Sequence, residues 1–180
     1  QLNLREKYLP IRPLILAGDD ICFIAEGRAG VELAKIFLEK LKEKSISGQP
    51  LNACAGVAIV KAHSPFSRAY ELAEELCQNG KNQLTKEDDS LLDWHLEQGE
   101  ISSDLEGIRQ EDYVADDGSL LNLRPYYVGS KKVNSMRNFY NSLDIISKNI
   151  ANDKREIPRS KVKELREIYR KGYEATKYYY

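Results

Sequence analysis

A short acidic motif, Gly18-Asp19-Asp20, lies between two apolar runs, and this arrangement constrains the fold more than any other feature of the sequence. The two runs cover residues 14–17 and 21–25. Both have compositions typical of β-strands, and a very short polar segment between such runs predicts a tight hairpin. Because the runs are continuously apolar, we expect these strands in the centre of a sheet that is covered on both faces.

Helices and strands alternate after this hairpin. Apolar residues recur at helical spacing over residues 30–44, which predicts an amphipathic helix. Residues 51–61 predict a further apolar strand. Ser64 and Pro65 are residues that are favoured at the start of a helix, and Gly80 is favoured at a helix end. A second helix is therefore expected between them. The order strand, strand, helix, strand, helix indicates an α+β fold.

Shorter elements are predicted in the next part of the chain. Residues 90–95 form a short strand pattern. Ser103 and Glu106 have the spacing of a capping box and predict the start of a brief helix. The dipeptide Asp117-Gly118 predicts a hairpin turn.

Charge divides the chain into two parts. Residues 1–129 hold 14 basic and 22 acidic side chains, and residues 130–180 hold 13 basic and 6 acidic ones. We expect an acidic α+β domain over residues 1–129 and a basic helical segment over residues 130–180, with helices over residues 133–150 and 159–171. The basic segment has two interpretations: ordinary solvated helix faces, or a surface for nucleic acid or an acidic partner subunit.

Several protein classes are excluded or disfavoured. No run of about 18 apolar residues is present, so no membrane-spanning helix is expected, and the polar start lacks the regions of a signal peptide. A cytoplasmic location without membrane contact is the expectation. The three cysteines, Cys22, Cys54 and Cys77, have no zinc or redox spacing, and we interpret them as small buried residues. Because the sequence begins without Met, we expect a fragment of a longer protein.

The acidic motif is the strongest candidate for chemistry. Asp19 and Asp20 place two carboxylates side by side at the end of a rigid hairpin, which favours a hard divalent cation such as Mg²⁺ or Mn²⁺. Gly18 permits a positive φ and the close approach of a nucleotide. The alternative is that Gly-Asp-Asp is simply a good turn sequence.

Three segments carry a family resemblance: LPIRPLILAGDD (residues 9–20), ACAGVAIVKAHSPF (residues 53–66) and YELAEEL (residues 70–76). They resemble the second palm domain of the large subunit of type III CRISPR effector complexes, which is similar to GGDEF diguanylate cyclases and adenylyl cyclases. The resemblance implies a ferredoxin-like palm over residues 1–129 that lacks its first strand, with residues 130–180 as an appended helical segment.

The resemblance also implies a function and site residues. The family's palm binds ATP with Mg²⁺ or Mn²⁺ and joins ATP into cyclic oligoadenylates in antiviral defence, with effector subunits and guide or target RNA as partners. Asp19 and Asp20 would be the catalytic, metal-binding pair, with Gly18 beside the nucleotide. Lys81 would contact the triphosphate, and its alternative role is that of a cation at a helix C-terminus. His63, at a strand-to-helix junction, would reach the ligand, or would bond to its own turn.

Two departures from the family pattern affect the expected activity. Ala17 stands where the family motif has a first glycine, and residues 1–13 contain no aspartate to serve as a further metal ligand. We therefore expect the fragment alone to be inactive. The alternative function is a catalytically inactive palm that acts as a scaffold or nucleotide sensor in a defence complex. A diguanylate-type cyclase is disfavoured because the motif lacks the Glu-Phe ending.

Overall fold

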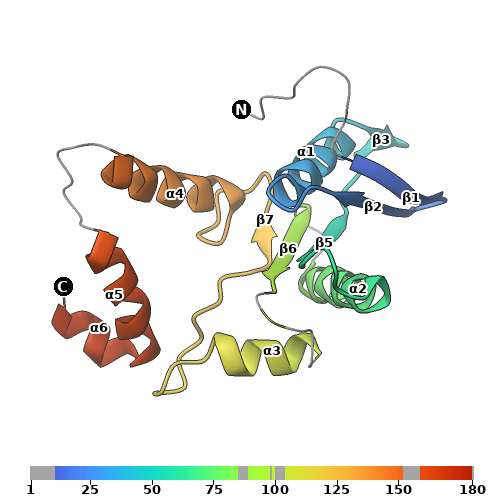
Figure 1. Cartoon of the computed structure of the whole chain (residues 1–180). Coiled ribbons are helices and arrows are strands. Elements are labelled where there is room, and N and C mark those ends of the chain that lie inside the picture. Colours follow the sequence, from blue (N-terminus) through green and yellow to red (C-terminus); the bar gives the residue numbers. More distant parts are fainter. Residues whose placement is uncertain (1–10, 85–88, 98, 100–103, 152–158, 180) are drawn as a thin grey trace. The chain divides into compact units, whose positions relative to one another are not determined.

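The structure is a computed structural model that describes residues 11–84, 89–97, 99, 104–151 and 159–179. The chain divides into two compact units, residues 1–101 and residues 102–180 (Figure 1). Both helices and strands are present, so the α+β class is confirmed. The functional boundary between residues 129 and 130 was inferred from charge, and it stays a prediction.

The first unit begins with the predicted hairpin. Strands β1 (Ile11–Ala17) and β2 (Asp20–Ala25) pair antiparallel, and Ala17 opposite Asp20 is the last pair before the turn. Gly18 and Asp19 form the two-residue loop, and Gly18 has a φ of 63°. A positive φ at the first loop residue is the geometry of a type II′ turn, for which glycine is favoured.

The hairpin is not the centre of a covered sheet, so this expectation was wrong. Among the described residues, β1 and β2 pair only with each other, and the side chain of Leu16 is 70% exposed. Pro13 lies within β1, and the pairing register shifts between Pro13 and Ile15. Proline has no N–H to donate and is tolerated in edge strands. An apolar run therefore identified the strands correctly without indicating what covers them.

A parallel strand pair and two helices follow the hairpin in the first unit. Strand β5 (Cys54–Ile59) pairs in parallel with β6 (Leu91–Leu96). Helix α2 (Phe66–Gln83) provides the crossover that a parallel pair requires, and α1 (Gly30–Lys42) connects β2 to the next strands. The most buried apolar side chains of this unit are Ala29, Ala34, Leu38, Leu72, Leu76, Leu91 and Leu92.

Both predicted ends of α2 differ from the observed ones. Pro65, not Ser64, is the N-cap, and it makes no side-chain cap bond. The helix continues through Gly80 to Gln83. A Cβ at Gly80 would lie 3.3 Å from the Cβ of Cys54, which shows that this glycine allows the helix to approach β5 closely. The close packing of α2 on β5 therefore explains the glycine at position 80, and the end of the helix does not.

A small additional hairpin was not predicted. Strands β3 (Ser45–Ile46) and β4 (Gln49–Pro50) pair antiparallel within the segment that was expected to be a loop. Ser47 and Gly48 form its turn with φ values of 52° and 81°.

The second unit is mainly helical. Helix α3 (Leu105–Asp112) starts at Asp104, whose Oδ1 accepts a hydrogen bond from the Gly107 N–H at 2.8 Å. The predicted cap Ser103 lies outside the described residues. The remaining elements are β7 (Tyr126–Tyr127), α4 (Met136–Ala151), α5 (Arg159–Arg170) and α6 (Tyr173–Tyr179). Helix α6 was not predicted. In the part of the chain described here, no helix is long and apolar enough to cross a membrane.

The predicted turn at Asp117-Gly118 is present and supports the junction between α5 and α6. The Asp116 N–H donates to the Arg170 carbonyl at 2.8 Å. Asp117 Oδ2 accepts from the Tyr173 N–H at 2.7 Å, and this is the first residue of α6. Between the two helices, Gly172 has a φ of 97°. The turn therefore caps α6 and holds the end of α5.

The Asp117 cap should make the second unit sensitive to acid. Backbone hydrogen bonds from Tyr173 and Ser119 hold the pKa of Asp117 below its ordinary value. A lowered pKa gives stability that is present above the unfolded-state pKa and is lost as the pH falls through the folded-state pKa. We expect Asp117→Asn to flatten the decrease in thermal stability below about pH 4. Circular dichroism melts of the full chain from neutral pH downward measure this effect. The matched control is Asp112→Asn, and an unchanged pH profile for Asp117→Asn would contradict the prediction.

Candidate functional site

The structure places Asp19 and Asp20 at the exposed tip of the hairpin. Asp19 lies in the turn itself and Asp20 is the first residue of β2. Both side chains are exposed. A Cβ added to Gly18 would meet no atom within 4 Å, so the space beside this glycine is open. The backbone conformation, and not a steric contact, is what requires glycine here.

One face of α2 carries polar and sulfur-containing side chains close to this hairpin. Tyr70, Glu74, Cys77 and Lys81 are separated by four, three and four residues, which places them on one helical face. The Tyr70 hydroxyl is hydrogen-bonded to Glu74, and this bond raises the pKa of Tyr70. The charge of Asp20 adds to the same shift. Asp20 therefore lies close enough to α2 for electrostatic coupling.

The charges of Lys81 and Asp20 both affect the pKa of the Cys77 thiol. Burial is the main cause that raises the pKa of Cys77, the charge of Lys81 lowers it, and the charges of Glu74 and Asp20 raise it. The predicted helix ended at Gly80, which would place Lys81 after it. In the structure Lys81 instead lies in the last turn of α2. A cation in the last turn is also favoured by the helix dipole. The structure thus brings an ammonium group and the hairpin carboxylate to one region.

The two thiols on this side of the unit are suited to packing. Cys77 Sγ donates to the carbonyl oxygen of Cys54 at 3.3 Å. Burial raises the pKa of the Cys54 thiol to about 11. A thiol with a raised pKa stays protonated at neutral pH and is a poor nucleophile. This supports the interpretation of these cysteines as small packing residues, although both are only partly buried.

His63 does not join this group. It is exposed and precedes α2, whereas Lys81 lies in the last turn of the same helix. The part of α2 from Phe66 to Lys81 has a length of about 22 Å. His63 and Lys81 therefore cannot bind the same phosphate group.

The donor set at the hairpin fits a cation that is shared with phosphate. In the part of the chain described here, no group of three or more His, Cys, Asp or Glu side chains is arranged to hold a metal ion. Asp19 and Asp20 supply two carboxylates. Mg²⁺ typically binds through one or two carboxylates together with substrate phosphates and water. Two adjacent carboxylates are therefore compatible with a Mg²⁺–nucleotide complex.

Two polar features of this unit were not predicted from the sequence. Glu74 faces the hairpin region, a position that the helical spacing from Lys81 could have indicated. Asp93 on β6 is fully buried and accepts a hydrogen bond from Asn79 Nδ2 at 2.7 Å. A single aspartate in an apolar strand was its only sequence signal. His95 is buried, with its Nε2 at 3.4 Å from Glu97 Oε2, in agreement with a packing role.

Comparisons with known proteins gave no match, either to a family model or to a curated protein. The family resemblance therefore rests on the residues quoted from the sequence.

Proposed function

We propose that residues 1–129 form a palm-type nucleotidyltransferase domain that binds ATP together with Mg²⁺. One observation carries this proposal: Asp19 and Asp20 are consecutive, exposed residues at the tip of a type II′ hairpin, and the space beside the neighbouring Gly18 is open. Carboxylates on a rigid turn are preorganised to bind a hard cation. The order of β1, β2, α1, β5 and α2 agrees with a palm.

Each side chain has a distinct role in this proposal. The two carboxylates would hold the cation, and the Lys81 ammonium group would neutralise phosphate charge. Gly18 leaves room for the nucleotide. Bound Mg²⁺ would neutralise the phosphate charge and lower the pKa of an attacking hydroxyl. Lys81 provides a compact point charge, which suits phosphate binding by lysine.

The family resemblance narrows the biological role. We place the domain in the large subunit of a type III CRISPR effector complex, where the full-length protein would convert ATP into cyclic oligoadenylates. Effector subunits and guide or target RNA would then be its partners. The described chain alone is expected to bind ATP without forming product, because no aspartate in residues 1–13 can serve as a third ligand.

A non-catalytic palm that senses nucleotide or serves as a scaffold is the second candidate. Ala17 favours it, because this residue pairs with Asp20 and adds a methyl group beside the motif. The two candidates differ in product formation and agree in nucleotide binding. Incubation of the full-length parent with ATP, followed by chromatography of the products, separates them: oligoadenylates indicate the enzyme, and their absence despite binding indicates the sensor.

Binding calorimetry of the chain tests the shared part of both candidates. We expect ATP to bind in the presence of Mg²⁺ and to lose most of its affinity when EDTA removes the cation. Adenosine, which has no phosphate, is the matched control ligand and should bind weakly under both conditions. ATP binding that is equal with and without Mg²⁺ would contradict the proposed site.

A further inference from the structure

Helix α5 of the second unit carries a line of three cations that has no role in the proposed ATP–Mg²⁺ site. Lys163, Arg166 and Arg170, named here the basic stripe, are separated by three and four residues and therefore share one helical face. Lys163 and Arg166 are exposed, and Arg170 is half-buried. None of the three forms an ion pair with any residue that the structure describes. Their charges remain available to a partner.

Exposed tyrosines lie beside the basic stripe in sequence. Tyr169 follows Arg166 by three residues and is 42% exposed, and Tyr173 follows Arg170 by three residues and is 66% exposed. Tyr178 at the other end of α6 is 90% exposed. Tyrosine is enriched at interfaces because its ring is apolar and its hydroxyl group is polar. Cations and exposed rings therefore occur together on the α5–α6 pair.

The helix pair is held in place independently of the basic stripe. Lys161 Nζ contacts the Tyr179 hydroxyl at 2.5 Å and lies 4.8 Å from the centre of its ring. The cap at Asp117 fixes the start of α6. These contacts connect α5 to α6 and fix the start of α6. The helices that carry the basic stripe and the tyrosines are therefore held together by other residues.

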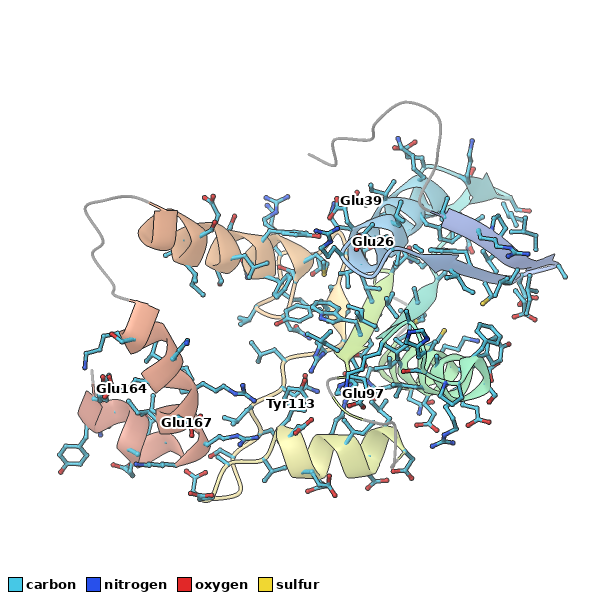
Figure 2. The ribbon with its side chains drawn as sticks, in the orientation of Figure 1. Glu26, Glu39, Glu97, Tyr113, Glu164 and Glu167 are labelled. Atoms are coloured by element: carbon cyan, nitrogen blue, oxygen red, sulfur yellow. The ribbon has the colours of Figure 1, made fainter. Side chains whose placement is uncertain are left out.

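Acidic side chains on α5 only partly offset the positive charge. Figure 2 shows Glu164 and Glu167 on this helix. Glu164 Oε2 lies 3.0 Å from Lys161 Nζ, so its charge is compensated by a lysine outside the basic stripe. Residues 159–179 contain seven basic and three acidic side chains, which leaves a net positive charge. The surface therefore favours an anionic partner.

We propose that the basic stripe, together with Tyr169, Tyr173 and Tyr178, binds single-stranded nucleic acid. The basic stripe extends over about 10 Å of helix, which suits contact with two or three successive phosphates. Tyrosine rings stack on unpaired bases, and such stacking does not depend on sequence. An acidic protein would use the cations and leave these rings without a comparable partner. The combination of charge and exposed rings favours the nucleic acid.

Fluorescence anisotropy with a labelled oligouridine of about 15 nucleotides tests the proposal on the full chain. The variant Lys163→Gln/Arg166→Gln/Arg170→Gln should bind at least about tenfold more weakly. The slope of log affinity against log salt should decrease in magnitude by about 2, since each phosphate contact on a single strand contributes about 0.7. The matched control, Arg12→Gln/Lys44→Gln/Lys61→Gln, removes the same charge from the first unit and should bind like the wild type.

A second variant separates stacking from charge. Tyr173→Ser/Tyr178→Ser should weaken binding about fivefold or more, with the salt slope unchanged. Circular dichroism verifies that each variant retains its helices. Affinity of the basic-stripe variant within twofold of the wild type, or an equal loss in the matched control, would overturn the proposal. Binding of a polyglutamate peptide without binding of oligouridine or oligothymidine would overturn it in favour of an acidic protein partner.

Discussion

The substitution Gly56→Ala is expected to destabilise the first unit more than a Gly→Ala substitution at any other glycine of this unit. A Cβ at this position would overlap the carbonyl oxygen of Ala73 and lie 2.5 Å from the backbone nitrogen of Cys77. Both atoms belong to the backbone of α2, which cannot rotate away as a side chain can. Insertion of volume into a packed interior typically costs about 1–3 kcal/mol. We expect a loss at the upper end of this range or beyond, because β5 and α2 must separate.

Urea denaturation of the full chain, followed by circular dichroism, measures this loss. Gly80→Ala is the matched control at the same interface, because its Cβ would lie 3.3 Å from the Cβ of Cys54 and meet no backbone atom that closely. Alanine also favours the interior of a helix over glycine by about 1 kcal/mol, which offsets part of the cost of this close contact, so Gly80→Ala should lose clearly less stability than Gly56→Ala. Equal stability of Gly56→Ala and the wild type would show that α2 does not pack on β5 as described.

The double substitution Asp19→Asn/Asp20→Asn is expected to abolish Mg²⁺-dependent ATP binding. Changes to groups that merely support metal ligands cost about 10–100-fold in affinity, so loss of both proposed ligands should cost at least about 100-fold. Asparagine keeps the size of the side chain and removes the charge. Both residues are exposed, so the free energy of unfolding should change by less than about 0.5 kcal/mol. Calorimetry with ATP and Mg²⁺ measures the affinity.

The matched control is Asp112→Asn/Asp116→Asn, which removes two exposed carboxylates from the second unit. It should bind ATP like the wild type. If the hairpin variant retains wild-type affinity, Asp19 and Asp20 form only a turn. If both variants lose affinity equally, net charge and not a local site determines the binding.

Local signals in the sequence predicted the hairpin and the first helix well. Gly18 between two apolar runs identified the turn, because a two-residue loop with positive φ leaves few alternatives to glycine. The apolar periodicity after residue 30 identified α1. Both features are determined by residues that are close together in the chain, so the sequence alone is sufficient to predict them.

Features that depend on distant residues were not predicted correctly. Gly80 resembled a helix end, yet α2 continues because this glycine faces β5. The hairpin was expected to be covered, yet β1 and β2 pair only with each other among the described residues. Composition indicates a preference for burial or for a break in a helix. It does not indicate which element will lie opposite.

In the candidate site, too, local features were predicted and contacts between distant residues were not. Asp19 and Asp20 were proposed from two adjacent carboxylates in a predicted hairpin turn and from the family resemblance. The proximity of Glu74 and Lys81 to Asp20 depends on how α2 lies against the first strands, and the effects of these charges on the pKa values of Tyr70 and Cys77 indicate it. His63 was grouped with them from its place at a strand-to-helix junction, but the length of α2 separates it from Lys81.

Nuclear magnetic resonance with Mn²⁺ in place of Mg²⁺ shows whether the cation binds at the hairpin. Paramagnetic Mn²⁺ broadens the amide signals of nearby residues, and amide spectra are recorded with ATP before and after substoichiometric Mn²⁺. We expect the signals of Gly18, Asp19 and Asp20 to disappear first, and we expect Asp19→Asn/Asp20→Asn to prevent this. Broadening centred on other acidic residues, with the hairpin signals unchanged, would show that the cation does not bind at Asp19 and Asp20.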